Sequence, residues 1–244
     1  MLQTHQLTKR YEDNQLALDS LNLQIEPGKI FFLLGANGAG KTTTINLFLN
    51  FITPTMGTVS INGIDATKDP LEAKKHVSFL SENVMLYGNF TARQNLDFFA
   101  KLGGKTKMTK ADYYALLRKV GLQDEAFEKK LKTFSKGMRQ KVGLAIAIIK
   151  DAPNILLDEP TSGLDPKSAA ELMQLLLQLR GQGKSILMCT HDIFRAKAIA
   201  DRVGIMKEGR LVMLRTRDQF LQDDLERIYL DYMQEAMMDA ATVN

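Results

Sequence analysis

Residues 35–42 of this chain are Gly35-Ala36-Asn37-Gly38-Ala39-Gly40-Lys41-Thr42, and Thr43 completes the expected binding loop. They match the phosphate-binding pattern G-x-x-x-x-G-K-[ST], whose glycines let the backbone curl so that successive N–H groups point at phosphate oxygens. A helix beginning at Lys41 would direct the positive end of its dipole at the same anion. Lys41 is expected to reach the β- and γ-phosphates of a nucleotide, and the Thr42 hydroxyl to ligate Mg²⁺. The loop therefore predicts a site for a nucleoside triphosphate.

The segments on either side of this loop predict an α/β fold. Residues 30–34 are continuously apolar, as expected for a strand buried on both faces, and they lead directly into the loop. A helix is expected from Lys41 to about Phe51. Further apolar strands are expected at 155–157 and 185–189, with a helix at 166–180 between them. Such alternation predicts a mixed, mostly parallel sheet, here the core of a phosphate-loop NTPase.

Two other parts of the chain differ from this alternation. Residues 2–7 and 21–25 alternate apolar and polar side chains, which predicts an N-terminal antiparallel β subdomain. Residues 88–150 have helical character and predict an inserted helical subdomain. The expected helix starts are Thr91, Thr109 and Ser135. We expect one domain over residues 1–231 and a short tail over 232–244.

Composition restricts the class of protein. The 244 residues are 45% hydrophobic with a formal net charge of +4, and Lys and Arg are interspersed with acids, so no nucleic-acid partner is expected. Cys189 is the only cysteine, which excludes an intrachain disulfide, and its apolar surroundings predict a buried side chain. The first residues lack a signal-peptide pattern, and no segment has the ~20 apolar residues of a membrane-spanning helix. We expect the chain to stay in water on one side of a membrane.

A pair of acids follows the apolar residues Leu156 and Leu157. Asp158 is expected to hold the Mg²⁺ shell. Glu159 is placed to activate water as a general base. Taken alone, the pair could simply begin a loop, but its combination with the phosphate-binding loop favours a catalytic role.

Three further motifs define a family. They are Phe134-Ser135-Lys136-Gly137-Met138, Ser162-Gly163-Leu164-Asp165 and Thr190-His191-Asp192. Together with the loop and the acids, their order closely resembles that of ABC (ATP-binding cassette) ATPases, from about Leu2 to about Asp231. Phosphate-loop kinases and GTPases have no counterpart of the first motif, which we call the signature motif.

The resemblance implies ATP and Mg²⁺ as cofactors and assigns roles to further residues. Tyr11 resembles the aromatic residue that stacks on adenine, although it could instead be a surface tyrosine at a strand end. Ser135 and Gly137 match residues that bind the γ-phosphate held by the opposite subunit. Asp165 resembles the residue that communicates across the dimer. His191 resembles the switch histidine that contacts the γ-phosphate.

Two motifs depart from the family pattern. The signature motif usually has the sequence L-S-G-G-Q, but here Lys136 stands at the third position and Met138 at the fifth. Where a Gln of the loop joining the two lobes commonly ligates Mg²⁺, this chain has Glu82. A carboxylate can bind Mg²⁺ as well, and its charge is expected to alter ATP affinity or release.

These departures and the ending at residues 224–230 resemble a subgroup that powers exporters through separate membrane subunits. The implied partners are transmembrane permease subunits and a second ATP-binding subunit, identical or not, at the cytoplasmic face of the membrane. The alternative is a soluble ABC ATPase outside transport, although such proteins usually carry two cassettes or long coiled-coil insertions. A regulator that does not hydrolyse ATP is disfavoured by Glu159 and His191.

The loop after Glu82 predicts the contact with the membrane subunit. Met85, Leu86 and Tyr87 resemble the groove that receives a short cytoplasmic helix of that subunit. Phe98 and Phe99 on the next helix are expected in the core of the helical lobe.

Overall fold

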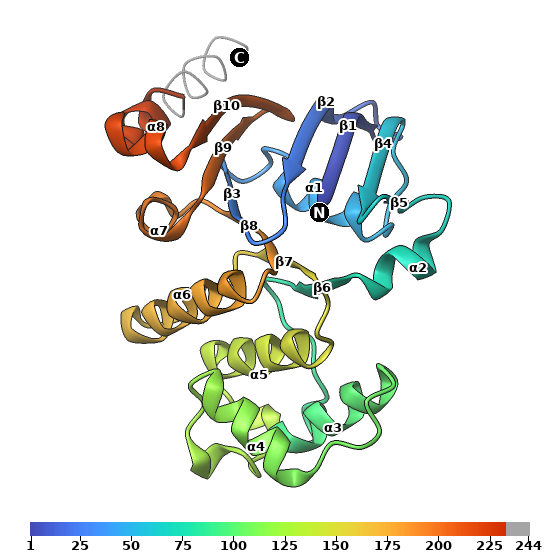
Figure 1. Cartoon of the computed structure of the whole chain (residues 1–244), viewed down its shortest axis with the longest axis vertical. Coiled ribbons are helices and arrows are strands. Elements are labelled where there is room, and N and C mark those ends of the chain that lie inside the picture. The colour runs from blue at the N-terminus through green and yellow to red at the C-terminus, as the bar shows by residue number, and fades with distance from the viewer. Residues whose placement is uncertain (233–244) are drawn as a thin grey trace.

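The structure is a computed structural model that describes residues 1–232. It has two lobes, which Figure 1 shows one above the other. The upper, core lobe contains a four-stranded antiparallel sheet in the order β2-β1-β4-β5 and a six-stranded sheet in the order β10-β9-β3-β8-β7-β6. The lower, helical lobe comprises residues 88–150. The α/β fold class, with its antiparallel and mostly parallel sheets, is confirmed.

The six-stranded sheet is parallel except where β9 pairs with β10. Its strands are β3 (Ile30–Leu34), β6 (Val77–Leu80), β7 (Asn154–Asp158), β8 (Ser185–Thr190), β9 (Arg202–Lys207) and β10 (Arg210–Thr216). In the register, Leu34 lies opposite Thr190 and Asp158 lies opposite Cys189. The carboxyl ends of three neighbouring strands therefore meet at one edge, where ligands of open α/β sheets bind.

The continuous apolar character of these strands has a simple cause. In β3, Ile30, Phe32 and Leu34 face one hydrophobic cluster, whereas Phe31 and Leu33 face another. Because side chains alternate between the faces of a strand, a sheet covered on both faces requires apolar residues at every position. Cys189 of β8 is fully buried, as predicted.

The antiparallel sheet and the helices cover these two faces. The sheet consists of β1 (Leu2–Arg10), β2 (Leu16–Ile25), β4 (Met56–Ile61) and β5 (Ile64–Asp65). The helices of the core lobe are α1 (Lys41–Phe48), α2 (Pro70–Lys75), α6 (Pro166–Gly181), α7 (Ile193–Ile199) and α8 (Arg217–Gln222). Helix α1 ends before the predicted Phe51 because Asn50 adopts a left-handed backbone with φ 48°, which a helix cannot continue through.

The helical lobe confirms the predicted capping patterns. Its elements are α3 (Ala92–Leu102), the 3₁₀ turns η1 (Asp124–Ala126) and η2 (Leu131–Thr133), α4 (Lys110–Lys119) and α5 (Lys136–Ile149). Thr91 and Thr109 form capping boxes, and Ser135 accepts a hydrogen bond from the Met138 amide as the N-cap of α5. The expectation that Phe98 lies in the core was wrong. Helix α3 buries Ala92, Leu96 and Ala100, and this spacing leaves Phe98 37% exposed.

Buried side chains connect the two lobes. One hydrophobic cluster contains Leu96 and Leu117 of the helical lobe together with Leu157 and Ile186 of the six-stranded sheet. The single domain over residues 1–231 stays a prediction, and its tail lies outside the described residues from 233 onward. Across residues 1–232, no helix has the length and apolar character needed to cross a bilayer.

Candidate nucleotide site

The phosphate-binding loop connects β3 to α1 and takes a backbone path that needs glycine. Gly38 and Gly40 have φ angles of 81° and 105°, in the left-handed region. A Cβ on Gly40 would lie 2.6 Å from the carbonyl oxygen of Ala17, so a larger residue would displace the backbone. Gly40 is also the N-cap residue of α1, which directs the helix N-terminus into the loop.

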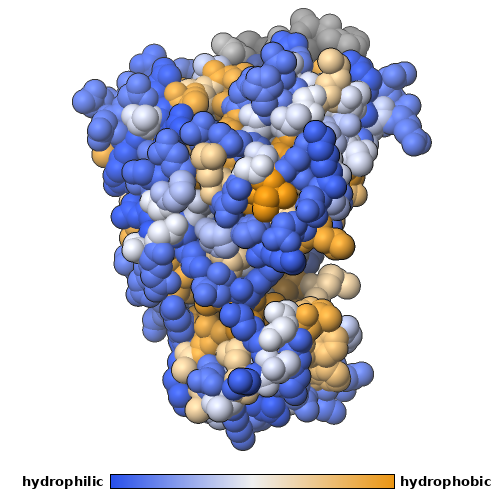
Figure 2. All heavy atoms as spheres, turned by 45° about the vertical axis from the view of Figure 1, so that its right-hand side comes forward, coloured by the Kyte–Doolittle hydropathy of each residue, from blue (hydrophilic) through white to orange (hydrophobic). Residues whose placement is uncertain are grey.

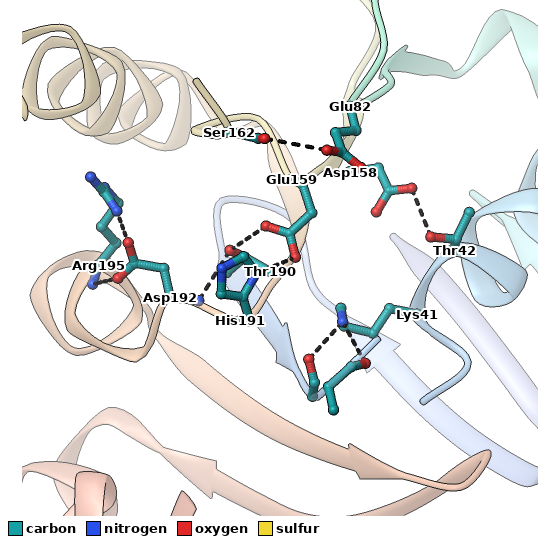
Figure 3. A network of polar contacts seen from close by, with 12 residues as sticks. Lys41, Thr42, Glu82, Asp158, Glu159, Ser162, Thr190, His191, Asp192 and Arg195 are labelled. Atoms are coloured by element: carbon teal, nitrogen blue, oxygen red, sulfur yellow. Dashed lines mark hydrogen bonds and ion pairs between the residues drawn. The ribbon is translucent and has the colours of Figure 1, made fainter. Parts of the chain in front are cut away.

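Lys41 is buried, with 6% of its surface exposed. Its ammonium group donates hydrogen bonds to the carbonyl oxygens of Gly35 (2.6 Å) and Ala36 (3.0 Å) of the loop, as Figure 3 shows. The cation is therefore fixed inside the curve of the loop, where a phosphate would encounter it.

Thr42 and Asp158 form the next pair at this edge. The Thr42 hydroxyl donates to Asp158 Oδ2 at 2.9 Å. Burial raises the pKa of Asp158, the nearby charge of Glu159 adds to this, and the bond from Thr42 opposes it. A bound cation would remove the electrostatic cost of this buried carboxylate.

The chemistry of these donors fits Mg²⁺, which prefers oxygen and takes part of its shell from substrate phosphates. Within residues 1–232, no three His, Cys, Asp or Glu side chains are grouped so as to hold a metal. Thr42 and Asp158 would therefore supply only part of the shell. Glu82, predicted as a third ligand, has its carboxylate turned to Lys136 and Ser162 at 3.3 and 3.2 Å.

Glu159 is held by the segment at the end of β8. The Thr190 hydroxyl donates to Glu159 Oε2 at 2.9 Å, and His191 Nδ1 lies 2.9 Å from Oε1. The Glu159 side chain is 13% exposed and the His191 side chain 68% exposed. The backbone of Glu159 is itself left-handed, with φ 43°. A nearly buried carboxylate with two fixed partners has the arrangement of an oriented general base.

The signature motif lies at the start of α5. The side chain of Ser135 caps this helix and the residue is exposed. Gly137 faces the carbonyl of Gly163, from which an added Cβ would lie 3.2 Å. No hydrogen bond of the described residues joins Ser135 or Gly137 to the phosphate-binding loop of the same chain. Their predicted role on the nucleotide of a second subunit stays a prediction.

Asp165 and Tyr11 also stay predictions in their functional roles. Asp165 caps α6 and accepts hydrogen bonds from the Ser168 hydroxyl (2.6 Å) and amide (2.9 Å), which lower its pKa. Tyr11 follows β1, and the ammonium of Lys9 lies 5.3 Å from its ring centroid. Tyr11 also lines an open pocket of about 850 Å³ together with Asn50 and others.

Two residues contact the predicted site although no role was predicted for them from the sequence. Thr190 orients Glu159, and Ser162 bonds to Glu82. Thr190 directly precedes His191 at the end of an apolar strand, and a polar residue at that place could have indicated a role in the site. The partner of Glu82 on α5 lies 54 residues away in sequence, and only its charge, opposite to that of Glu82, indicated the pairing.

The combination of a phosphate-binding loop, strand-end acids and a capped signature helix defines an ATP-binding cassette. The sequence profile of the ABC transporter family matches residues 18–162. The chain is 38% identical to the bacitracin transport ATP-binding protein BcrA of Bacillus licheniformis over 213 residues, 87% of this chain and 68% of BcrA. It is 34% identical to the ABC transporter ATP-binding protein NatA of Bacillus subtilis, covering 84% of this chain and 85% of NatA.

A solved structure agrees. The dimeric post-hydrolysis state of the ATP-binding cassette MJ0796 bound to ADP and Pi has a TM-score of 0.81 and 28% identity, covering 89% of this chain and 99% of that one. The chain belongs to the ABC transporter family.

Proposed function

We propose that this chain is the ATP-hydrolysing subunit of an ABC exporter, bound to separate transmembrane subunits at the cytoplasmic face of the membrane. One observation carries the hydrolytic part: Glu159 is fixed by Thr190 and His191 at 2.9 Å each. It lies at the same sheet edge as the Thr42–Asp158 pair and the phosphate-binding loop (Figure 3). A base, a cation and Mg²⁺ ligands together are what hydrolysis of a phosphoanhydride requires.

The residues would divide the work as follows. Lys41 and the loop amides would hold the β- and γ-phosphates, and Thr42 and Asp158 would hold Mg²⁺, which would neutralise charge on the phosphate oxygens. Glu159 accepts a proton from the attacking water, and Thr190 and His191 keep its carboxylate oriented. Tyr11 stacks on the adenine.

We propose that two such subunits enclose two ATP molecules. Ser135 is exposed and caps α5. With Gly137 and the N-terminus of α5 it could bind an anion, and within residues 1–232 it makes no hydrogen bond to the phosphate-binding loop of its own chain. It would bind the γ-phosphate held by the second subunit, and Asp165 would face the dimer interface. The dimeric structure of MJ0796 supports this arrangement. Closure of the pair would then move the membrane subunits, and hydrolysis would reopen it.

The membrane partner would dock on the loop after β6. Met85 is 88% and Tyr87 49% exposed. The Tyr87 ring packs against Phe90 and Phe98, with centroids 5.2 and 4.9 Å away. Buried Asn95 fixes its backbone by accepting from the Tyr87 amide (3.0 Å) and donating to its carbonyl (3.1 Å). These aromatic side chains form a rigid, exposed platform that suits a short helix.

An apolar pocket of about 440 Å³ lies at the junction of the two lobes, close to this platform. Phe79, Phe99 and Leu102 are among its lining residues, and Lys74 and Lys150 also border it. Apolar residues gather on the helical lobe and near its junction with the core lobe in Figure 2. Exposed apolar surface of this kind marks an interaction site.

Export is favoured by the relatives' names, which include proteins of bacitracin transport, daunorubicin resistance and Nod factor export. The competing function is a soluble ABC ATPase outside transport. Co-purification with a hydrophobic membrane subunit separates the two, because a soluble ATPase would have none.

The test of hydrolysis is Glu159→Gln, which keeps the side-chain shape and removes the base. We expect ATP turnover to fall about 10²- to 10⁴-fold with ATP binding retained, and dimers stabilised by ATP to appear on size-exclusion chromatography. The matched control is Glu125→Gln, at an exposed position of η1, which should keep normal turnover. Normal turnover in Glu159→Gln would exclude Glu159 as the base.

A further inference from the structure

Two of the residues that depart from the family pattern, Lys136 and Glu82, contact each other. Lys136 Nζ lies 3.3 Å from Glu82 Oε1. The hydroxyl of Ser162 accepts a hydrogen bond from Lys136 Nζ at 2.8 Å and donates to Glu82 Oε1 at 3.2 Å. The contact therefore joins the loop after β6, the N-terminus of α5 and the loop after β7.

Packing around Lys136 shows that this contact is built into the fold. The Lys136 stem lies against Gly163, where an added Cβ would be 2.9 Å from Lys136 Cδ. The same helix also binds the backbone of Glu82, because Gln140 Nε2 donates to its carbonyl at 3.2 Å and Gln140 is buried. Both side chain and backbone of Glu82 are thus held by α5.

The charge of Glu82 bears on the nucleotide site of its own chain. Figure 3 shows its carboxylate beside Asp158, and its charge acts on that residue. The charges of Glu159 and Glu82 both act on Asp158, which lies at the proposed phosphate site. Since like charges repel, an uncompensated Glu82 opposes phosphate binding, whereas a neutral Gln would not.

We propose that Lys136 is a positioning residue that neutralises and holds the Glu82 carboxylate, so that the signature helix of each chain regulates ATP affinity at that chain's own phosphate-binding loop. This inference rests on the proposed function. In this proposal helix α5 has two roles: its cap at Ser135 binds the nucleotide of a second subunit, and Lys136 acts on the nucleotide site of its own chain. The pair Glu82 and Lys136 replaces a neutral pair, and neither charge is favourable without the other.

The test measures ATP affinity of the isolated chain in EDTA, by displacement of a fluorescent ATP analogue. Lys136→Ala leaves Glu82 unpaired and should weaken ATP binding about fivefold, the scale of one partly exposed ion pair. Glu82→Gln/Lys136→Ala should return to within about twofold of the wild type. Lys136→Arg, which keeps the charge, should bind normally, and so should Lys132→Ala, which removes an exposed lysine of the same lobe.

A purely structural role for Lys136 predicts a different result. In that case Lys136→Ala and the double variant would bind ATP equally weakly, and this outcome overturns the inference. Thermal melting of each variant identifies loss of folding, and Lys136→Gln replaces Lys136→Ala if the latter melts early. Lys41→Ala tests the proposed nucleotide site separately from the role of Lys136. If it binds ATP normally, the proposed site is wrong, whereas lost binding without rescue in the double variant contradicts only the role of Lys136.

Discussion

The residues with predicted functions are buried in the core lobe but exposed in and beside the helical lobe. In the core lobe, Lys41 and Asp158 are buried and bonded to other residues of the same chain. By contrast, Ser135 of the helical lobe and Tyr87, which lies just before that lobe, are exposed and contact only nearby residues. The core lobe therefore has a site that one chain assembles by itself, whereas the roles proposed for Ser135 and Tyr87 each require another molecule.

Charge follows the same division. Residues 88–150 contain 14 Lys and Arg but 5 Asp and Glu, whereas the remainder of the chain contains 18 basic and 23 acidic residues. The near balance over the whole chain conceals this difference, which becomes visible once the lobe boundary is known. A basic lobe suits contacts with anionic groups of other molecules.

The largest effect is expected in the core lobe. Lys41→Ala removes the fixed cation of the phosphate-binding loop, so ATP turnover should fall on the order of a hundredfold or more, with weaker ATP binding. Lys107→Ala, at an exposed position of the helical lobe, is the matched control and should behave normally. Turnover near that of the wild type in purified Lys41→Ala would show that the phosphate-binding loop of the core lobe is not the nucleotide site.

Ser135→Arg tests whether the helical lobe acts on another chain. The larger side chain blocks the anion site, so turnover should fall by about 10²-fold while the isolated chain still binds ATP, because its own loop is intact. Nucleotide affinity by fluorescence titration and turnover by phosphate release are measured on one preparation. Loss of ATP binding by the isolated chain would contradict the assignment of Ser135 to the partner's nucleotide.

Tyr87→Ala tests the exposed aromatic surface at the boundary of the helical lobe. We expect association with the membrane subunit to weaken by about 1–3 kcal/mol, as at an interface hot spot, with folding and basal turnover preserved. Co-purification from detergent-solubilised membranes measures the first, and thermal melting of the isolated subunit the second. Phe194→Ala removes an aromatic residue of α7 that is 70% exposed and serves as the control. An early melt of Tyr87→Ala would place Tyr87 in the core.

The smallest effect concerns the junction of the lobes. A Cβ on Gly143 of α5 would lie 2.7 Å from Val84 Cγ1 and 2.8 Å from Leu80 Cδ1. Gly143→Ala should therefore lower the free energy of unfolding by about 1 kcal/mol, measured in urea. Gly181→Ala, where an added Cβ meets no atom within 4 Å, should not be destabilised. Equal stabilities of the two variants would show that the lobes are packed loosely here.

The sequence predicted the core lobe better than the helical lobe for a physical reason. The strands at 30–34, 155–157 and 185–189 are apolar at every position because both faces are buried, and this signal is local. The exposure of Phe98 and the pairing of Glu82 with Lys136 depend on which segments pack together. No periodicity within a single element records such contacts, and the roles assigned to Ser135 and Asp165 additionally require a second chain.

The burial of Cys189 has a practical consequence for labelling experiments. Its thiol is fully buried behind the phosphate-binding loop, 3.8 Å from the Lys41 carbonyl oxygen, and burial raises its pKa well above the ordinary value. Labelling requires the thiolate to attack the thiol reagent, so the buried thiol of the folded chain is unreactive. A dye or spin label can therefore be attached to one introduced cysteine in each lobe without first removing Cys189. The distance between two such probes would report directly whether the two lobes move relative to each other when ATP binds.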